Sequence, residues 1–386
     1  MINHSISLLL KLTFAIIGLF AFLQVYSVQA ILPILQQDFS ANETQLGLMV
    51  GATVIGIAII SPFIGLLSDR FGRKNIIILS ILGLAIPTFL MSFAPSLNAM
   101  IILRFVQGIA VPGITVVTIA YIGEEISGKH LSQSMSMYVS GTVLGGFLGR
   151  FILGHLQEIM GWRKAFIIMG VATLIGAIWV AWQLPSSKNF IANQNLKSSL
   201  QIFKQHLSNR HIIMPALLGM CVLFSLVGCF TYINLHLANE PYRLSSADLA
   251  NIFAIYLIGM VITPIAGQLI HRFGTQCIIM GATMLSMLGV LLSLVNPLTG
   301  VIIALTLMST GVFITQSATI SYIAINVQQG RSLASGIYYS GYYLGGFIGA
   351  WICAMAYAYG QWTWTVITLF MVQCIALIIA FFGLKK

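Results

Sequence analysis

Charged residues are scarce in this sequence. Only 7% of the 386 residues are charged, whereas 58% are hydrophobic. An average globular chain carries about a quarter charged residues. A chain of this composition has too little polar surface to cover a water-soluble body of its size, so lipid must surround most of its exterior. A soluble fold is therefore excluded.

The sequence also lacks the alternation of polar and apolar residues that a membrane β-barrel requires. Its apolar runs are continuous, and each approaches the ~20 residues that cross ~30 Å of hydrocarbon as a helix. Lipid offers no partners to backbone groups, so a spanning segment must be a helix or part of a closed barrel. We therefore predict an all-α membrane protein. The first run continues past Ala30 to Leu35, which favours an uncleaved span over a signal peptide.

Signatures of disulfide, metal and nucleic-acid binding are missing as well. The five cysteines lie inside apolar runs without the spacing of a disulfide framework, so we interpret them as packing residues. The formal net charge of +10 comes from cations scattered over loops rather than from one basic face. We expect no metal, no cofactor and no nucleic-acid partner, and we expect a monomer surrounded by membrane lipid.

Twelve apolar runs predict twelve transmembrane helices. They lie near residues 11–36, 44–66, 75–94, 98–121, 133–156 and 162–184, and near residues 211–237, 247–270, 275–295, 298–323, 332–358 and 361–383. The long polar stretch of the sequence separates these two sets. We therefore predict two pseudo-symmetric six-helix bundles, residues 1–184 and 211–386, joined by a cytoplasmic linker over residues 185–210.

The distribution of lysine and arginine predicts the orientation. With both termini inside, thirteen of these residues fall in cytoplasmic segments, whereas Arg163, Lys164 and Arg243 fall outside. Cytoplasmic loops of membrane proteins carry the excess of positive charge. We therefore predict a multi-pass protein of the bacterial inner membrane with cytoplasmic N- and C-termini.

The two halves repeat each other. Residues 138–149 match residues 338–349 at a constant offset of 200, and Trp162 pairs with Trp362. A second match, offset by 202, aligns the segment 65–72 with 267–274. Duplicated halves of this kind are typical of secondary transporters.

The loop between the second and third spans carries a distinctive spacing. It reads GLLSDRFGRK, which is a glycine, three variable residues, Asp-Arg, one variable residue and Gly-Arg-Lys. This spacing resembles the signature loop of the major facilitator superfamily. Its gating residues here are Gly65, Asp69, Arg70, Gly72, Arg73 and Lys74. The resemblance implies that Asp69 pairs with a cation or with a neighbouring helix N-terminus and holds the cytoplasmic side closed.

Further patterns extend this resemblance over essentially the whole chain. Arg104 and Gln107 lie in a stretch similar to the second motif of the family, in which an intramembrane arginine faces the cavity. Leu32-Pro33 followed by Asp38 resembles another family pattern. Within the family, the sequence most resembles the twelve-span bacterial drug or metabolite exporters, and this resemblance implies proton antiport.

Glycines recur at four-residue spacing in the fifth and eleventh spans, so they line one face of each helix and permit close helix packing. They are Gly141, Gly145 and Gly149 with Gly341, Gly345 and Gly349. The pattern resembles the fifth-span motif of antiporters, with two departures. Gly146 replaces the usual proline, and Arg150 replaces the closing glycine. These departures weaken export as an inference.

Enzymatic and nucleotide-driven functions find no support in the sequence. The stretch Gly123–His130 nearly matches a phosphate-binding loop, but it ends in His rather than Ser or Thr and lies between two membrane spans. Metalloprotease and hydrolase signatures are missing. We therefore predict a protein that is not an enzyme and that draws energy from a gradient.

These patterns predict a secondary active transporter that exports a small organic molecule, a drug or a metabolite, against entering protons by alternating access. Two alternatives stay open. One is uptake of a solute together with protons. The other, from a different class, is a receptor or scaffold that keeps the transporter fold without transporting.

Polar and aromatic side chains within the spans are the candidates for the cavity lining. They are Gln24, Tyr26, Gln29, Arg104, Gln107, Tyr138, Arg150, Tyr232, Asn234, His236, Tyr256, Gln316, Tyr339 and Tyr342. Together they suit an amphipathic organic molecule. For each one, the alternative is a satisfied hydrogen bond between helices.

The carrier of the coupling proton is harder to identify. All eight carboxylates lie in loops or near helix ends. His236 with Glu240, and Glu124 or Glu125, are the titratable candidates. The alternative is that all four are solvated helix ends.

Two intramembrane arginines predict the charge of the substrate. Arg104 and Arg150 lie at similar depth in the outer half of the first bundle, and neither has an obvious acidic partner in the sequence. A buried arginine costs about 2.5 to 3.5 kcal/mol, and an anion would offset this cost. We therefore hypothesise a carboxylate- or phosphate-bearing solute, for example an organic acid or a siderophore. Alternatively, Arg104 binds backbone carbonyls and Arg150 reaches the interface.

Overall fold

The computed structural model describes residues 7–126, 129–187, 204–327 and 331–384. Within these ranges the chain is almost entirely helical and has no strand. The first six spans comprise α1 (Leu8–Leu23), the 3-10 helix η1 (Ser27–Ile31), α2 (Leu32–Phe39), α3 (Glu43–Ile60), α4 (Ile64–Phe71), α5 (Arg73–Met91), α6 (Leu97–Glu125), α7 (Lys129–Met160) and α8 (Trp162–Gln183). Most of the predicted linker, residues 188–203, lies outside the described residues.

The second set of spans begins with α10 (Arg210–Ala238) and continues with α11 (Ser246–Ile252), η2 (Phe253–Leu257), α12 (Ile258–Phe273), α13 (Thr275–Leu292), α14 (Leu298–Asn326), α15 (Arg331–Ile378) and η3 (Ile379–Gly383). Helix α15 is not one straight helix, because Gly360 and Gln361 have non-helical dihedral angles. This break divides α15 into two spans.

The described residues account for the twelve predicted spans. Ten helical stretches are long and apolar enough to cross a membrane, and the bent pair of α1 with η1 and α2 makes an eleventh. The break within α15 supplies the twelfth. The prediction of an all-α membrane protein with twelve spans is therefore confirmed.

Two of the spans are broken where the sequence analysis expected continuous helices. The first span bends by 46° between α1 and η1, and Pro33, which lacks an N–H, lies in the first turn of α2. The second span is interrupted between α3 and α4, where Pro62 follows Ser61. Such breaks release backbone carbonyls from helical hydrogen bonds.

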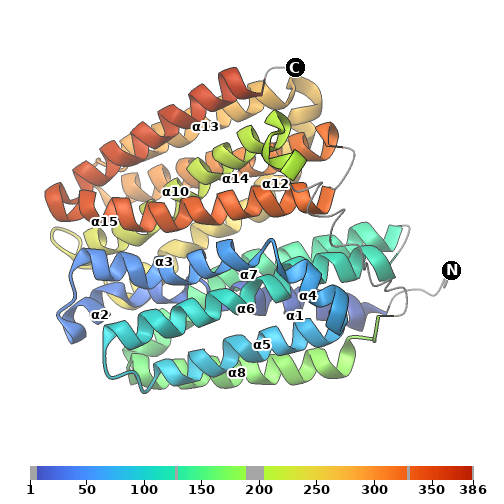
Figure 1. Ribbon diagram of the computed structural model, residues 1–386. Helices are drawn as coiled ribbons and strands as arrows, with labels where there is room; N and C mark the ends of the chain where they lie inside the picture. The colour runs from blue at the N-terminus through green and yellow to red at the C-terminus, as the bar shows by residue number, and fades with distance from the viewer. Residues whose placement is uncertain (1–6, 127–128, 188–203, 328–330, 385–386) are drawn as a thin grey trace.

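The six spans from α1 to α8 gather below those from α10 to α15 (Figure 1). The start of α1 and the end of the last helix lie at the same end of the molecule, at the right in this view. We call this end the termini side and the other end the opposite side. Helix α3 packs on α15 at the boundary between the two sets, where Gly47 meets Ala350. We call the first six spans the N-half and the last six the C-half.

Candidate substrate cavity and gates

A cavity of about 480 Å³ lies between the two halves. Helices α1, α6 and α7 line it from the N-half, and η2, α10, α12, α14 and α15 line it from the C-half. Its polar lining residues include Tyr26, Thr115, Tyr138, Thr142, Arg150, Tyr256, Thr263, Gln316, Ser317, Ser321, Tyr339, Tyr342 and Tyr343. The volume falls within the range of small-molecule sites, and the tyrosines provide both flat apolar faces and hydroxyl groups.

Arg150 lies at one end of this cavity and is fully buried. Its Nε donates a hydrogen bond to Oε1 of Gln29 at 2.9 Å, and its Nη1 donates to the carbonyl of Gly146 at 2.6 Å. Nη2 has no hydrogen-bond acceptor among the described residues. The guanidinium therefore retains one free donor group inside the protein.

Aromatic rings surround this guanidinium. Its central carbon lies 4.3 Å from the ring centre of Tyr256, 4.4 Å from that of Phe253 and 4.9 Å from that of Tyr26. These contacts partly compensate a buried cation. Among the lining residues that the structure describes, Arg150 is the one charged side chain, and no Asp, Glu, Lys or His accompanies it. The end of the cavity at Arg150 is therefore electropositive.

The cavity extends from Arg150 toward the termini side. Its lining reaches Ile119 near the end of α6 and Ser321 near the end of α14, and both helices end on the termini side. In the other direction, the lining ends at Arg150, ten residues before α7 ends at Met160. The cavity is therefore displaced toward the termini side.

Hydrogen bonds between the halves close the opposite side. Gln29 Nε2 donates to Thr231 Oγ1 at 2.9 Å, and Asn234 Nδ2 donates to the Gln29 carbonyl at 3.1 Å. The backbone N–H of Ala247 donates to Oε1 of Glu158 at 2.8 Å. Each of these bonds joins the N-half to the C-half.

Arg104 is equally buried but does not line the cavity. It donates to the Gln24 carbonyl at 2.5 Å, to the Val25 carbonyl, to the Met49 carbonyl at 3.3 Å and to Oε1 of Gln107 at 2.8 Å. The break after α1 leaves the carbonyls of Gln24 and Val25 available, and the guanidinium binds them. This is the alternative predicted for Arg104, in which its guanidinium binds backbone carbonyls and not a solute.

Some of the remaining candidates line the cavity, and the others are buried in contacts between helices or lie away from it. The structure brings Tyr26, Tyr138, Tyr256, Gln316, Tyr339 and Tyr342 together in the lining, whereas Gln24, Gln29, Gln107, Tyr232, Asn234 and His236 do not line the cavity. Gln24 donates to Thr173, and Gln107 donates to Thr88. Tyr232 donates to the Ala350 carbonyl at 2.7 Å.

Several lining residues were not among the candidates predicted from the sequence. Serine and threonine are common where membrane helices pack together, so Thr115, Thr142, Thr263, Ser317 and Ser321 could not be singled out. Tyr343 lies within the repeated segment 338–349, and this position could have identified it. Phe22 and Phe313 carry no polar group and cannot be distinguished in sequence from packing residues.

The four candidates for the coupling proton lie outside the cavity lining. His236 stacks on Trp362 with ring centres 5.8 Å apart, and the exposed Glu240 pairs with Arg243. Glu124 binds Arg73. Glu125 lies at the end of α6. None of these groups is placed to exchange a proton directly with a solute beside Arg150.

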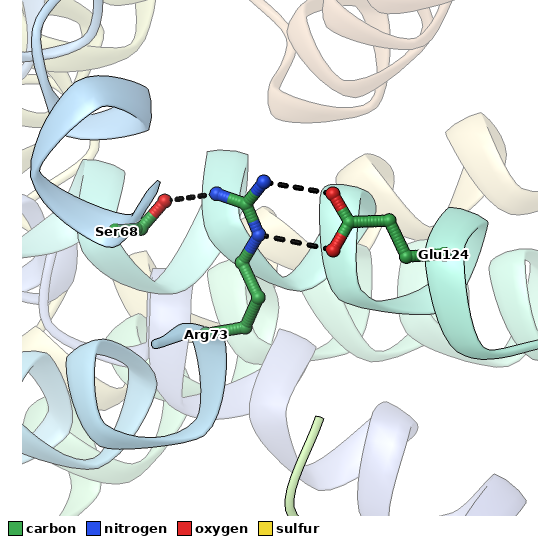
Figure 2. A network of polar contacts seen from close by, with 3 residues as sticks. All are labelled: Ser68, Arg73 and Glu124. Atoms are coloured by element: carbon green, nitrogen blue, oxygen red, sulfur yellow. Dashed lines mark hydrogen bonds and ion pairs between the residues drawn. The ribbon is translucent and has the colours of Figure 1, made fainter. Parts of the chain in front are cut away.

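The loop with the family signature forms a polar network (Figure 2). Gly72 has φ +85° between α4 and α5, and Gly274 has φ +81° at the equivalent turn between α12 and α13. The turn requires a conformation that glycine adopts without strain. Arg73 donates from Nε and Nη2 to the two carboxylate oxygens of Glu124, at 3.1 and 2.7 Å, and from Nη1 to Ser68. Gly65, Asp69 and Arg70 lie in α4, and the side chains of Asp69 and Arg70 are not among those that the structure describes.

Glu124→Gln is expected to lower the free energy of unfolding by about 1–3 kcal/mol. The side chain of Arg73 is 9% exposed, so the loss of its carboxylate leaves a nearly buried cation without its bidentate partner. Glu240→Gln is the matched control, because the pair of Glu240 with Arg243 is exposed and should contribute about 0–1 kcal/mol. Thermal unfolding in detergent measures both variants. Equal stability of the two would contradict a structural role for the pair.

Small residues allow α7 and α15 to pack closely on α1 and α10. A Cβ atom at Gly141, Gly145 or Gly149 would lie 1.9 to 2.1 Å from a carbonyl oxygen of α1. At Gly345 and Gly349 it would lie 2.0 and 2.5 Å from carbonyl oxygens of α10. At Gly341 the distance is 3.1 Å. Both halves therefore use their glycines for close contact between helix backbones.

Comparisons with known proteins agree with this architecture. The Major Facilitator Superfamily profile matches residues 14–350. An uncharacterized transporter of Buchnera aphidicola subsp. Schizaphis graminum (strain Sg) is 32% identical over 346 residues, which cover 89% of this chain and 84% of the relative. A gentisate transporter of Corynebacterium glutamicum is 27% identical over 303 residues, which cover 75% of this chain and 67% of the relative.

The fold has close counterparts among solved structures. The crystal structure of a mutant of the nucleoside transporter NupG superposes with a TM-score of 0.81 at 14% identity, covering 97% of this chain and 100% of that chain. At this level of identity the likeness concerns the fold. Together with the family profile over most of the sequence and the twelve spans in two halves, it shows that this chain belongs to the major facilitator superfamily and is a membrane transporter.

Proposed function

We propose that this protein transports a small aromatic anion bearing a carboxylate, and that it does so by alternating access. The observation that carries the proposal is the free Nη2 donor of the buried Arg150, in a cavity whose described lining contains no acid. A buried, incompletely paired cation is costly in a membrane, and a bound carboxylate would offset that cost with charge-assisted hydrogen bonds.

The rest of the cavity supports an aromatic solute. The rings of Tyr339 and Tyr343 lie nearly parallel, with centres 6.3 Å apart, and Tyr342 meets both edge to face. Tyrosine faces favour flat apolar groups, while their hydroxyls suit a polar rim. The relative described as a gentisate transporter is consistent with this class, since gentisate is an aromatic carboxylate.

The orientation supports a cavity that opens to the cytoplasm. The Lys and Arg distribution predicts that both termini lie inside, and the cavity is displaced toward the termini side. We infer an inward-facing state of an inner-membrane protein. An impermeant thiol reagent should leave a cysteine at Lys74 unlabelled in intact cells, and labelling from outside would contradict this orientation.

We propose that transport is efflux coupled to entering protons, and the resemblance of the sequence to the exporter branch supports this direction. Purified protein in liposomes would be tested with radiolabelled gentisate and, as a control, with an uncharged aromatic amide of similar size. When the side opposite the termini is the more acidic, as outside a cell, protons should enter from that side, and gentisate should move from the termini side to the opposite side. If only the amide is transported, the proposed anionic substrate is wrong. If gentisate moves in the same direction as the protons, the protein is an uptake symporter. If neither compound is transported, a receptor is favoured.

A further inference from the structure

Gln29 links the cavity to the closed opposite side. Its Oε1 accepts from Arg150 Nε at 2.9 Å, while its Nε2 donates to Thr231 Oγ1 at 2.9 Å. Its carbonyl accepts from Asn234 Nδ2 at 3.1 Å. Arg150 belongs to the N-half, whereas Thr231 and Asn234 belong to the C-half. One fully buried side chain therefore connects the charge in the cavity with the contact between the halves.

The geometry of the guanidinium makes Gln29 the partner that a substrate would displace. Arginine binds a carboxylate side-on through Nε and Nη2, as Arg73 binds Glu124 in this protein. On Arg150, Gln29 occupies Nε and Nη2 is free. A carboxylate that uses both donors must therefore replace the Gln29 amide oxygen. The partner of Nη1 is a backbone carbonyl within α7, that of Gly146, and it is far less free to move.

We propose that Gln29 is the positioning residue through which binding of an anion at Arg150 loosens the closed opposite side. This inference rests on the proposed function. When the anion takes Nε, the Gln29 amide loses the cation that holds and polarises it, and its bond to Thr231 weakens, because linked hydrogen bonds strengthen one another. The loaded protein then opens on the opposite side more readily than the empty one. Coupling between two sites is typically about 5- to 150-fold in an equilibrium constant.

Two substitutions break the connection between Arg150 and Thr231 at different bonds. Gln29→Leu removes the connection and frees the Nε and Nη2 pair of Arg150, so gentisate should bind with an affinity within about threefold of the wild type, or more tightly. Thr231→Val leaves the bond between Arg150 and Gln29 in place and removes only one of the bonds between the halves, the one that the Gln29 side chain donates to Thr231. Both variants should open the opposite side without gentisate. Gln24→Leu is the matched control, since Gln24 lies on the same span and donates to Thr173 within the N-half.

The experiment measures the distance between spin labels on the opposite side. Gln37, at the end of α2, and Asn296, between α13 and α14, are exposed and belong to different halves. Labelled cysteines at these positions, in protein whose five native cysteines are replaced, are measured by double electron–electron resonance with and without gentisate. Gentisate binding to the same samples is measured by calorimetry. In the wild type and in Gln24→Leu, gentisate should increase the ratio of molecules with the long label distance to those with the short one at least about fivefold.

The outcomes separate the two proposals. If Gln29→Leu is open without gentisate and gentisate changes its distances no further, the inference is supported, and the same result with Thr231→Val supports it independently. If Gln29→Leu binds and responds like the wild type, the role of Gln29 is rejected while the proposed function stands. If the wild type neither binds gentisate nor changes its distances, the proposed substrate class fails, and the link from substrate to Gln29 fails with it.

Discussion

Arg150→Gln is expected to reduce the affinity for gentisate, a member of the proposed substrate class, at least about 30-fold, which leaves only the contribution of the aromatic contacts. Removing a buried charge that pairs with a carboxylate costs about 2–5 kcal/mol, and ~1.4 kcal/mol corresponds to a factor of ten. Arg150→Lys keeps the charge but loses the planar pair of donors, so it should retain part of the activity. The affinity for gentisate and the rate of gentisate transport are measured for both variants. Equal affinity of wild type and Arg150→Gln would exclude Arg150 as the anion site.

The same substitution should leave the fold at least as stable. Arg150→Gln removes an incompletely paired buried charge, whereas Arg104→Gln removes the group that binds the carbonyls of Gln24, Val25 and Met49. Arg104→Gln is therefore the control in which stability falls, by about 1–3 kcal/mol for each buried carbonyl that is left without a donor. Thermal unfolding in detergent distinguishes them. If both variants lose stability equally, both arginines are structural.

Gly145→Ala is expected to prevent normal assembly of the N-half. The added Cβ would lie 2.1 Å from the Leu19 carbonyl oxygen, so α1 and α7 would have to move apart by about 1 Å along their contact. Overpacking of well-packed interiors costs about 1–3 kcal/mol, and more when backbone must move. We expect a large loss of monodisperse protein after extraction from the membrane, measured by size-exclusion chromatography.

The neighbouring residue provides the control for this prediction. A Cβ at Gly146 meets nothing closer than Arg150 Nη1, at 3.8 Å, so Gly146→Ala should assemble normally. Gly345→Ala should repeat the defect in the C-half, where the Cβ would lie 2.0 Å from the Met220 carbonyl oxygen. Normal yields of Gly145→Ala would show that the helices do not pack as closely as described.

The twelve spans and the glycine contacts follow from simple patterns, because lipid forces long apolar helices and small residues recur every fourth position. The breaks at Gln24 and Ser61 do not follow so directly. Proline marks both regions, yet whether a proline ends, bends or merely starts a helical segment depends on the partners of the released carbonyls. Those partners lie far away in the sequence.

This explains why the two buried arginines could not be separated from sequence alone. Arg104 and Arg150 look alike as single cations in apolar spans. Only the fold shows that the broken first span supplies carbonyls to Arg104, while Arg150 meets one glutamine, one carbonyl and three rings. The candidate tyrosines were more predictable, since the repeated segments place several of them on α7 and α15.

Arg150 is the single charged side chain among the described residues that line the cavity, so membrane voltage acts on this charge during the proposed transport cycle. With a monovalent anion bound, the site around Arg150 is neutral, whereas the empty site carries one positive charge. A potential that is negative inside therefore acts on the empty protein and favours the state in which Arg150 is exposed to the cytoplasm. Moving one charge across the whole membrane potential corresponds to about 2.3 kcal/mol per 100 mV. If the protein exports an anion as proposed, voltage in an energised cell would favour return of the empty binding site to the cytoplasmic side, where the next anion binds.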